Sequence, residues 1–73
     1  MNEITLIVER DEASGWLVAV WDAPEGGGIT TQGRDLTELQ AHVAEAVRCH
    51  FDEGKVPSRV RLHFVQDPEL AVA

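Results

Sequence analysis

The chain has 73 residues, and its six lysines and arginines against thirteen aspartates and glutamates give a net charge of −7 at pH 7. This length suits one small domain, and the negative charge opposes direct nucleic-acid binding while favouring basic protein partners. Because Cys49 is the single cysteine and no apolar run could span a membrane or serve as a signal peptide, we expect a cytoplasmic protein without an internal disulfide or a membrane partner.

The first part of the chain predicts a β-hairpin. From Ile4 to Arg10, the two alternating sets of residues have the period of a strand. Residues 11–15 have the sequence Asp-Glu-Ala-Ser-Gly, which is typical of a tight turn because Asp and Ser bond the local backbone. From Trp16 to Trp21 both alternating sets are apolar, as in a central strand that is covered on both faces. We therefore expect Trp16 and Trp21 to lie in the interface of a homodimer or higher homo-oligomer.

The strongest local signals predict an amphipathic helix after a glycine-rich loop over residues 22–28 and a short third strand, Ile29 to Gln32. Asp35 precedes the apolar periodicity and Glu38 follows three residues later, which is the capping-box pattern. Gly54 ends the pattern, so we expect a helix of about 17 residues. Its apolar stripe, at spacings of three and four, consists of Leu36, Leu39, Val43, Ala46, Val47 and His50 or Phe51.

Alternation returns from Arg59 to Val65, which predicts a fourth strand, and residues 67–73 are expected to form a tail after a single domain over residues 1–66. If the first three strands form a meander, a right-handed helical crossover brings the fourth strand back parallel to the first and beside it. We therefore expect a two-layer α+β fold of the order β-β-β-α-β. Its mixed four-stranded sheet has the strand order 3-2-1-4, with one helix packed on one face.

Three runs together resemble a known family: ERDEASGW over residues 9–16, the turn Thr31-Gln32-Gly33, and DLTEL over residues 35–39. They are similar to the HicB-like antitoxin domain, and the resemblance covers about residues 4–54. It implies a partial ribonuclease H fold. It also implies a non-enzymatic function, in which the domain binds a small basic toxin ribonuclease and blocks its action on messenger RNA.

Acidic residues at strand ends and in loops are the candidate contacts to such a toxin, and these are Asp11, Glu12, Asp22 and Glu25. Many members of the family continue into a segment that binds operator DNA, whereas this chain ends at Ala73, so we expect a solitary domain without direct nucleic-acid binding. A self-associating structural or ligand-binding domain with no toxin partner is the alternative.

No pattern in the chain predicts catalysis, a cofactor or a metal. The run Gly26-Gly27-Gly28 lacks the Lys-Ser or Lys-Thr that completes a phosphate loop, so it is interpreted as a strand connection. The candidate metal ligands lack the paired spacing of a zinc site; they are His42, Cys49, His50 and His63. Two-metal nuclease chemistry needs converging carboxylates, and Asp11, Glu12 and Asp22 are placed in turns or at strand ends. We therefore expect a protein that is not an enzyme.

Overall fold

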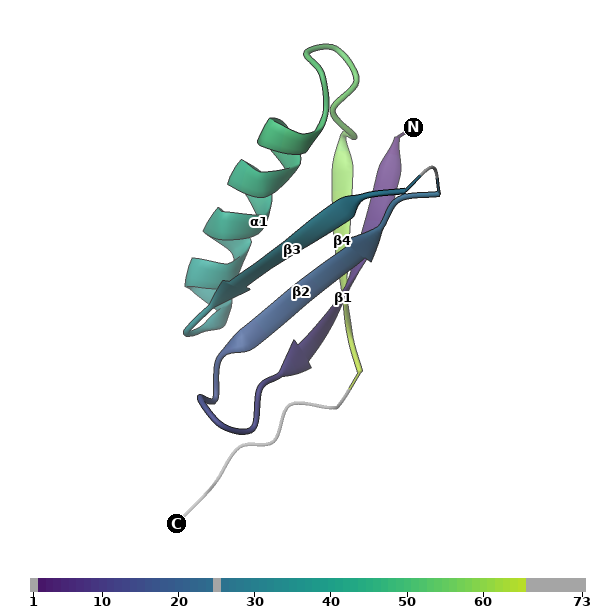
Figure 1. Cartoon of the computed structure of the whole chain (residues 1–73). Coiled ribbons are helices and arrows are strands. Elements are labelled where there is room, and N and C mark those ends of the chain that lie inside the picture. Colours follow the sequence, from purple (N-terminus) through teal and green to yellow (C-terminus); the bar gives the residue numbers. More distant parts are fainter. Residues whose placement is uncertain (1, 25, 66–73) are drawn as a thin grey trace.

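The computed structural model describes residues 2–24 and 26–65, and its elements follow the predicted order of three strands, a helix and a strand (Figure 1). These elements are β1 (Glu3–Arg10), β2 (Leu17–Asp22), β3 (Gly28–Gly33), α1 (Leu36–His50) and β4 (Arg59–Phe64). The sheet has the order β3-β2-β1-β4, with β1 antiparallel to β2 and parallel to β4. The predicted α+β fold and strand order are confirmed. The predicted tail, 67–73, lies outside the described residues.

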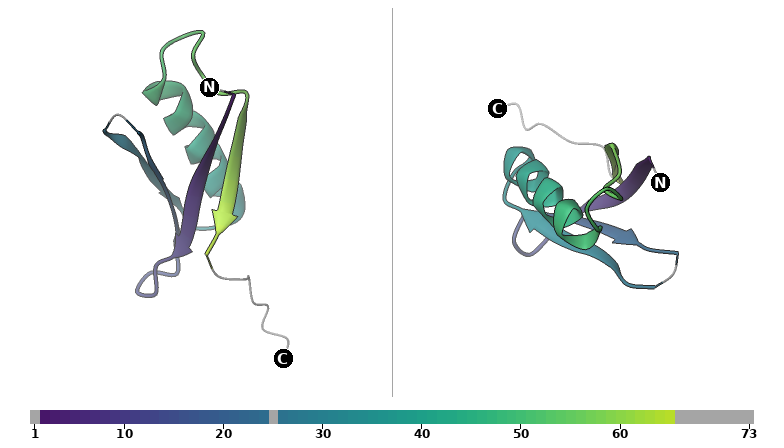
Figure 2. Two further views of the ribbon diagram at one scale, coloured as in Figure 1. Left: turned by 90° about the vertical axis from the view of Figure 1, so that its right-hand side faces the viewer. Right: turned by 90° about the horizontal axis from the view of Figure 1, so that it is seen from above.

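The core lies between the sheet and α1, which covers one sheet face (Figure 2). Each large aliphatic side chain in it contributes about 1.5–3 kcal/mol to the free energy of unfolding. The buried residues are Ile4, Leu6, Val8, Leu17, Ala19, Ile29, Leu39, Val43 and Val47. Leu36, which was expected in the helical stripe, is instead 44% exposed. It lies in the first turn of a helix that packs chiefly on β3, so the side chains of β4 do not cover it fully.

Several strand ends differ from their predicted positions by one residue, and two of the differing ends, those of α1 and β2, have a clear local reason. The helix has 15 residues and not about 17, because Phe51 leaves helical geometry and packs its ring against Trp21, with 5.4 Å between the ring centres. Gly54 therefore lies beyond the helix end. Strand β2 begins at Leu17 and not at Trp16, since the Trp16 carbonyl accepts a hydrogen bond from the Asp11 backbone N–H and so closes the turn.

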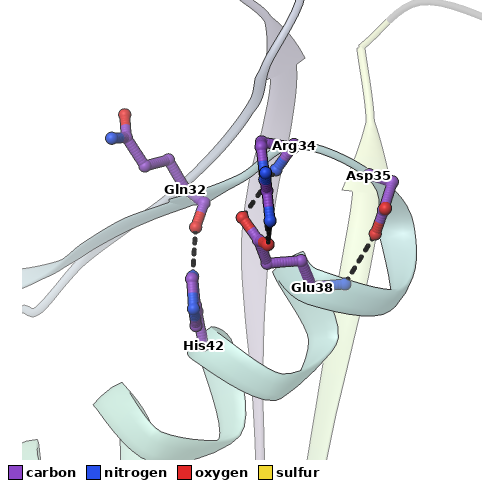
Figure 3. Close-up of polar contacts among 5 residues, drawn as sticks. All are labelled: Gln32, Arg34, Asp35, Glu38 and His42. Atoms are coloured by element: carbon purple, nitrogen blue, oxygen red, sulfur yellow. Dashed lines mark hydrogen bonds and ion pairs between the residues drawn. The ribbon is translucent and has the colours of Figure 1, made fainter.

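The start of α1 is fixed by side-chain hydrogen bonds (Figure 3). Asp35 is the N-cap, and its carboxylate accepts a bond of 2.8 Å from the Glu38 backbone N–H, as predicted. In a full capping box the Glu38 carboxylate would accept a hydrogen bond from the Asp35 backbone N–H, and here it does not. It accepts instead from the backbone N–H and the guanidinium of Arg34, at 3.0 Å in each case. These bonds lower the pKa of the Glu38 carboxyl below its usual range and raise the pKa of Arg34.

We expect Glu38→Gln to reduce the free energy of unfolding slightly at neutral pH. The pKa of Glu38 is lowered in the folded chain, so its contribution is present above the unfolded-state pKa and is lost as pH falls through the folded-state pKa. The difference between variant and parent should therefore shrink from pH 7 toward pH 2, as measured by urea unfolding. Glu45→Gln, on the exposed side of the same helix, is the control. A difference that stays constant with pH would contradict this assignment.

Candidate protein-binding surface

The sheet face opposite α1 carries a shallow hollow between β1 and β2. Its volume is about 460 Å³, and it is lined by Thr5, Ile7, Glu9, Val18, Val20, Trp21 and Asp22. Successive side chains of a strand point to opposite faces, so Ile7 is directed away from the core while Leu6 and Val8 are buried beneath α1. Within the described part of the chain, no helix covers this face (Figure 2). We call this surface the β1–β2 hollow.

The floor of the β1–β2 hollow is apolar and its ends are acidic. Ile7 pairs with Val20 across the two strands and is 42% exposed, while Val18 and Val20 are half-buried. Glu9 pairs with Val18 at one end, and Asp22 ends β2 at the other. Val18 and Asp22 are four positions apart along β2, so the two ends are separated by roughly 13 Å. An exposed apolar patch with a polar rim is typical of a protein-binding site.

The structure does not bring together Asp11, Glu12 and Asp22, the three predicted partner-binding residues that it describes. Asp11 and Glu12 lie in the turn between β1 and β2, whereas Asp22 lies at the far end of β2. The Asp11 carboxylate is engaged in the turn, where it accepts a bond of 2.8 Å from the Ser14 hydroxyl. Glu25 is outside the described residues. Of the three that the structure describes, Asp22 lines the β1–β2 hollow, and Asp11 and Glu12 do not.

The two tryptophans have different surroundings. Trp21 is half-buried and contacts the end of α1, with its ring 5.5 Å from His50 and 5.4 Å from Phe51 between ring centres. Trp16 is half-buried at the end of the β1–β2 turn, where its backbone N–H donates to the Ser14 hydroxyl at 3.2 Å. Trp21 thus packs against its own chain, and a subunit interface at Trp16 and Trp21 stays a prediction.

Sequence reasoning missed Ile7 and Glu9 as site residues, although the signal was present. The alternation from Ile4 to Arg10 places Thr5, Ile7 and Glu9 on one face, opposite the three aliphatic residues that the helix covers. A strand with an apolar residue on the face away from the helix predicts a surface of this kind. Negative charge alone points instead to the acidic residues in the turns.

The β1–β2 hollow offers apolar side chains and two carboxylates as binding groups. Among residues 2–24 and 26–65, no three His, Cys, Asp or Glu side chains are grouped so that they could hold a metal ion. Glu9 and Asp22, roughly 13 Å apart along the strand, are too distant to share a pair of metals separated by about 4 Å. His42 donates from Nδ1 to the Gln32 carbonyl at 2.6 Å, a contact that joins α1 to β3. No helix in the described part of the chain is long and apolar enough to cross a membrane.

Comparison with known proteins gives one informative likeness. The chain is similar to a protein of Thermotoga maritima named "UPF0150 protein", with 39% identity over 71 residues that cover 97% of this chain and 94% of that protein. The likeness therefore extends over nearly the whole length of both proteins. No protein-family model and no solved structure matches the chain.

Proposed function

The chain belongs to the UPF0150 family, and from this premise we propose that it is a non-catalytic, antitoxin-type domain that binds and neutralises a small basic toxin ribonuclease. The resemblance of residues 9–16 and 31–39 to the HicB-like domain supports this class of partner. The observation that carries the proposal is the β1–β2 hollow, an apolar surface with a carboxylate at each end, in a chain of net charge −7.

The hollow supplies the two kinds of contact that a tight complex needs. Ile7, Val18 and Val20 form an apolar floor on which a large side chain of the partner packs, and such buried central contacts supply most of the binding energy. Glu9 and Asp22 lie at the rim, where carboxylates increase the association rate with a basic protein and fix its orientation. Neutralisation then follows from occlusion, because the bound domain covers the RNA-binding surface of the toxin.

We expect the double variant Glu9→Lys/Asp22→Lys to lose binding to the short, strongly basic protein that the adjacent reading frame would encode. Each substitution places a like charge against the basic partner, so we expect the affinity to fall by about tenfold or more. The measurements are co-purification of the two co-expressed full-length chains, a dissociation constant by calorimetry, and protection of an RNA substrate from the partner.

The matched control is Glu45→Lys/Asp52→Lys, which changes the net charge equally at exposed positions away from the hollow. The proposal requires this control variant to bind the basic protein, and to protect the RNA substrate from it, as well as the parent chain does. It would be overturned if both double variants lost binding equally, which indicates net charge alone, or if the adjacent basic protein failed to bind the parent chain.

The second candidate function is self-association without a toxin, and one observation favours it. The sheet face that holds Glu9 and Asp22 also carries Arg59 and Arg61 on β4, so two copies could pair opposite charges around their apolar floors. Sedimentation analysis separates the two candidates. Under self-association, Glu9→Lys/Asp22→Lys would convert an oligomer to a monomer with no other protein present.

A further inference from the structure

Within the described part of the chain, backbone hydrogen-bonding groups on the outer edge of β4 have no strand partner. The Arg59 N–H donates to the Asn2 carbonyl and the Val65 N–H donates to the Val8 carbonyl, each at 3.1 Å, so the odd-numbered residues of this segment bond β1. Because backbone groups alternate in direction along a strand, those of Val60, Leu62 and Phe64 point to the outer edge. Among the residues that the structure describes, no strand pairs with that edge.

The other edge of the sheet, on β3, is in contact with the helix at its Gln32 end. His42 on α1 donates to the Gln32 carbonyl of β3, and α1 packs closely on β3 (Figure 3). Natural proteins cover sheet edges in this way, because an uncovered edge pairs with another chain. The two edges therefore differ: α1 bonds one carbonyl of the β3 edge, whereas none of the described side chains bonds the outer backbone groups of β4.

The two sides of β4 present opposite chemistry. On the helix side, an apolar groove of about 430 Å³ lies beside α1 and is lined mainly by Leu36, Gln40, Ala44, Val60, Leu62 and Phe64. On the other side lie Arg59, Arg61 and His63, all exposed. Arg61 is 3.6 Å from the Glu3 carboxylate, and its side chain remains 67% exposed. Even-numbered side chains thus line an apolar groove, and odd-numbered ones form a basic row.

We propose that the β4 edge binds an extended segment of a partner protein in which apolar and acidic residues alternate. Added as a fifth strand, this segment bonds the free backbone groups of β4, places its apolar side chains in the groove and directs its carboxylates to the basic row. The β4 edge shares no lining residue with the β1–β2 hollow, although Arg61 and His63 are the register partners of Thr5 and Ile7 on the same sheet face. The acidic segment therefore belongs to a second interaction and does not depend on a basic toxin.

Charge disfavours the simplest competing occupant, the β4 strand of a second copy. Antiparallel pairing of two β4 edges would bring Arg59 and Arg61 of both copies together on one face. Like charges that lie directly opposite across a strand pair are destabilising. The same row attracts a strand that carries carboxylates at alternate positions.

The test uses the full chain and fluorescent synthetic peptides in which valine alternates with glutamate or, as the control peptide, with lysine. We expect the glutamate peptide to bind and the lysine peptide to bind at least about tenfold more weakly. Methylation of the peptide's alternate backbone nitrogens should abolish binding, because it removes ladder hydrogen bonds and leaves the side chains unchanged. Amide NMR signals of Val60, Leu62 and Phe64 should shift most.

Protein variants complete the test. Arg59→Glu/Arg61→Glu should reverse the preference between the two peptides, whereas Arg48→Glu/Lys55→Glu, an equal charge change at exposed positions off β4, should preserve it. Equal binding of both peptides would overturn the proposal, as would shifts confined to the β1–β2 hollow or no binding by either peptide. A dimer formed through β4 that the glutamate peptide fails to dissociate would also overturn it.

Discussion

Gly33→Ala is expected to destabilise the domain by about 2–3 kcal/mol, although the new side chain is a single methyl group. A Cβ at this position would clash with the Leu39 backbone N and would lie 2.7 Å from the Leu39 Cα. Both atoms belong to the backbone of α1, so no side-chain rotation relieves the overlap. The end of β3 or the first turns of the helix must move, which strains the Asp35 cap as well. Urea unfolding followed by circular dichroism measures the loss.

Gln32→Ala is the matched control for this prediction. Gln32 is adjacent in β3 and exposed, and its backbone carbonyl still accepts the bond from His42 after truncation. We expect this variant to change the free energy of unfolding by about 0.5 kcal/mol or less. If Gly33→Ala were equally mild, the close approach of β3 and α1 would not be a feature of the folded chain.

The elements and their order could be predicted because they depend on local periodicity and on few topological choices. Alternation in residues 4–10 and the three-four spacing of Leu39, Val43 and Val47 identify a strand and a helix independently of their neighbours. The handedness of the crossover then leaves one place for β4. The helix end could not be predicted, because Phe51 leaves the helix to make a tertiary contact with Trp21 that no local pattern encodes.

The candidate surfaces were only partly predictable. Asp22 was predicted from charge and does line the β1–β2 hollow, but Asp11 was predicted on the same ground and its carboxylate serves the turn. Whether the apolar groove beside β4 stays open depends on where the helix lies on the sheet. Gly33 allows α1 to approach β3 closely, and this position leaves Leu62 half-exposed. The sequence identifies Gly33 as a turn residue. It does not reveal that the backbones of β3 and α1 come into close contact at this glycine.

Leu6→Ala is expected to cost about 3–4 kcal/mol, within the range for large-to-small changes in a core. Leu6 has no exposed surface, and it lies in β1, which has a neighbouring strand on each side. A domain of this size has a free energy of unfolding of only about 4–11 kcal/mol, so this one change removes a large part of it. Unfolding can be followed by tryptophan fluorescence, to which Trp21 contributes from its contact with the end of α1. Leu6→Val, with a smaller expected loss, serves if the alanine variant fails to fold.

Ile7→Ala provides the comparison, because Ile7 is the next residue of the same strand and its side chain points to the opposite face. At 42% exposure it makes fewer intramolecular contacts, so we expect a loss of about 1 kcal/mol or less in the isolated chain. A loss as large as that of Leu6→Ala would mean that another surface buries Ile7. If that surface were a second copy, the loss would increase with protein concentration, because association adds to the stability of the folded state. If the loss stayed small, the β1–β2 hollow would be free to accept a different protein, as the proposed antitoxin function requires.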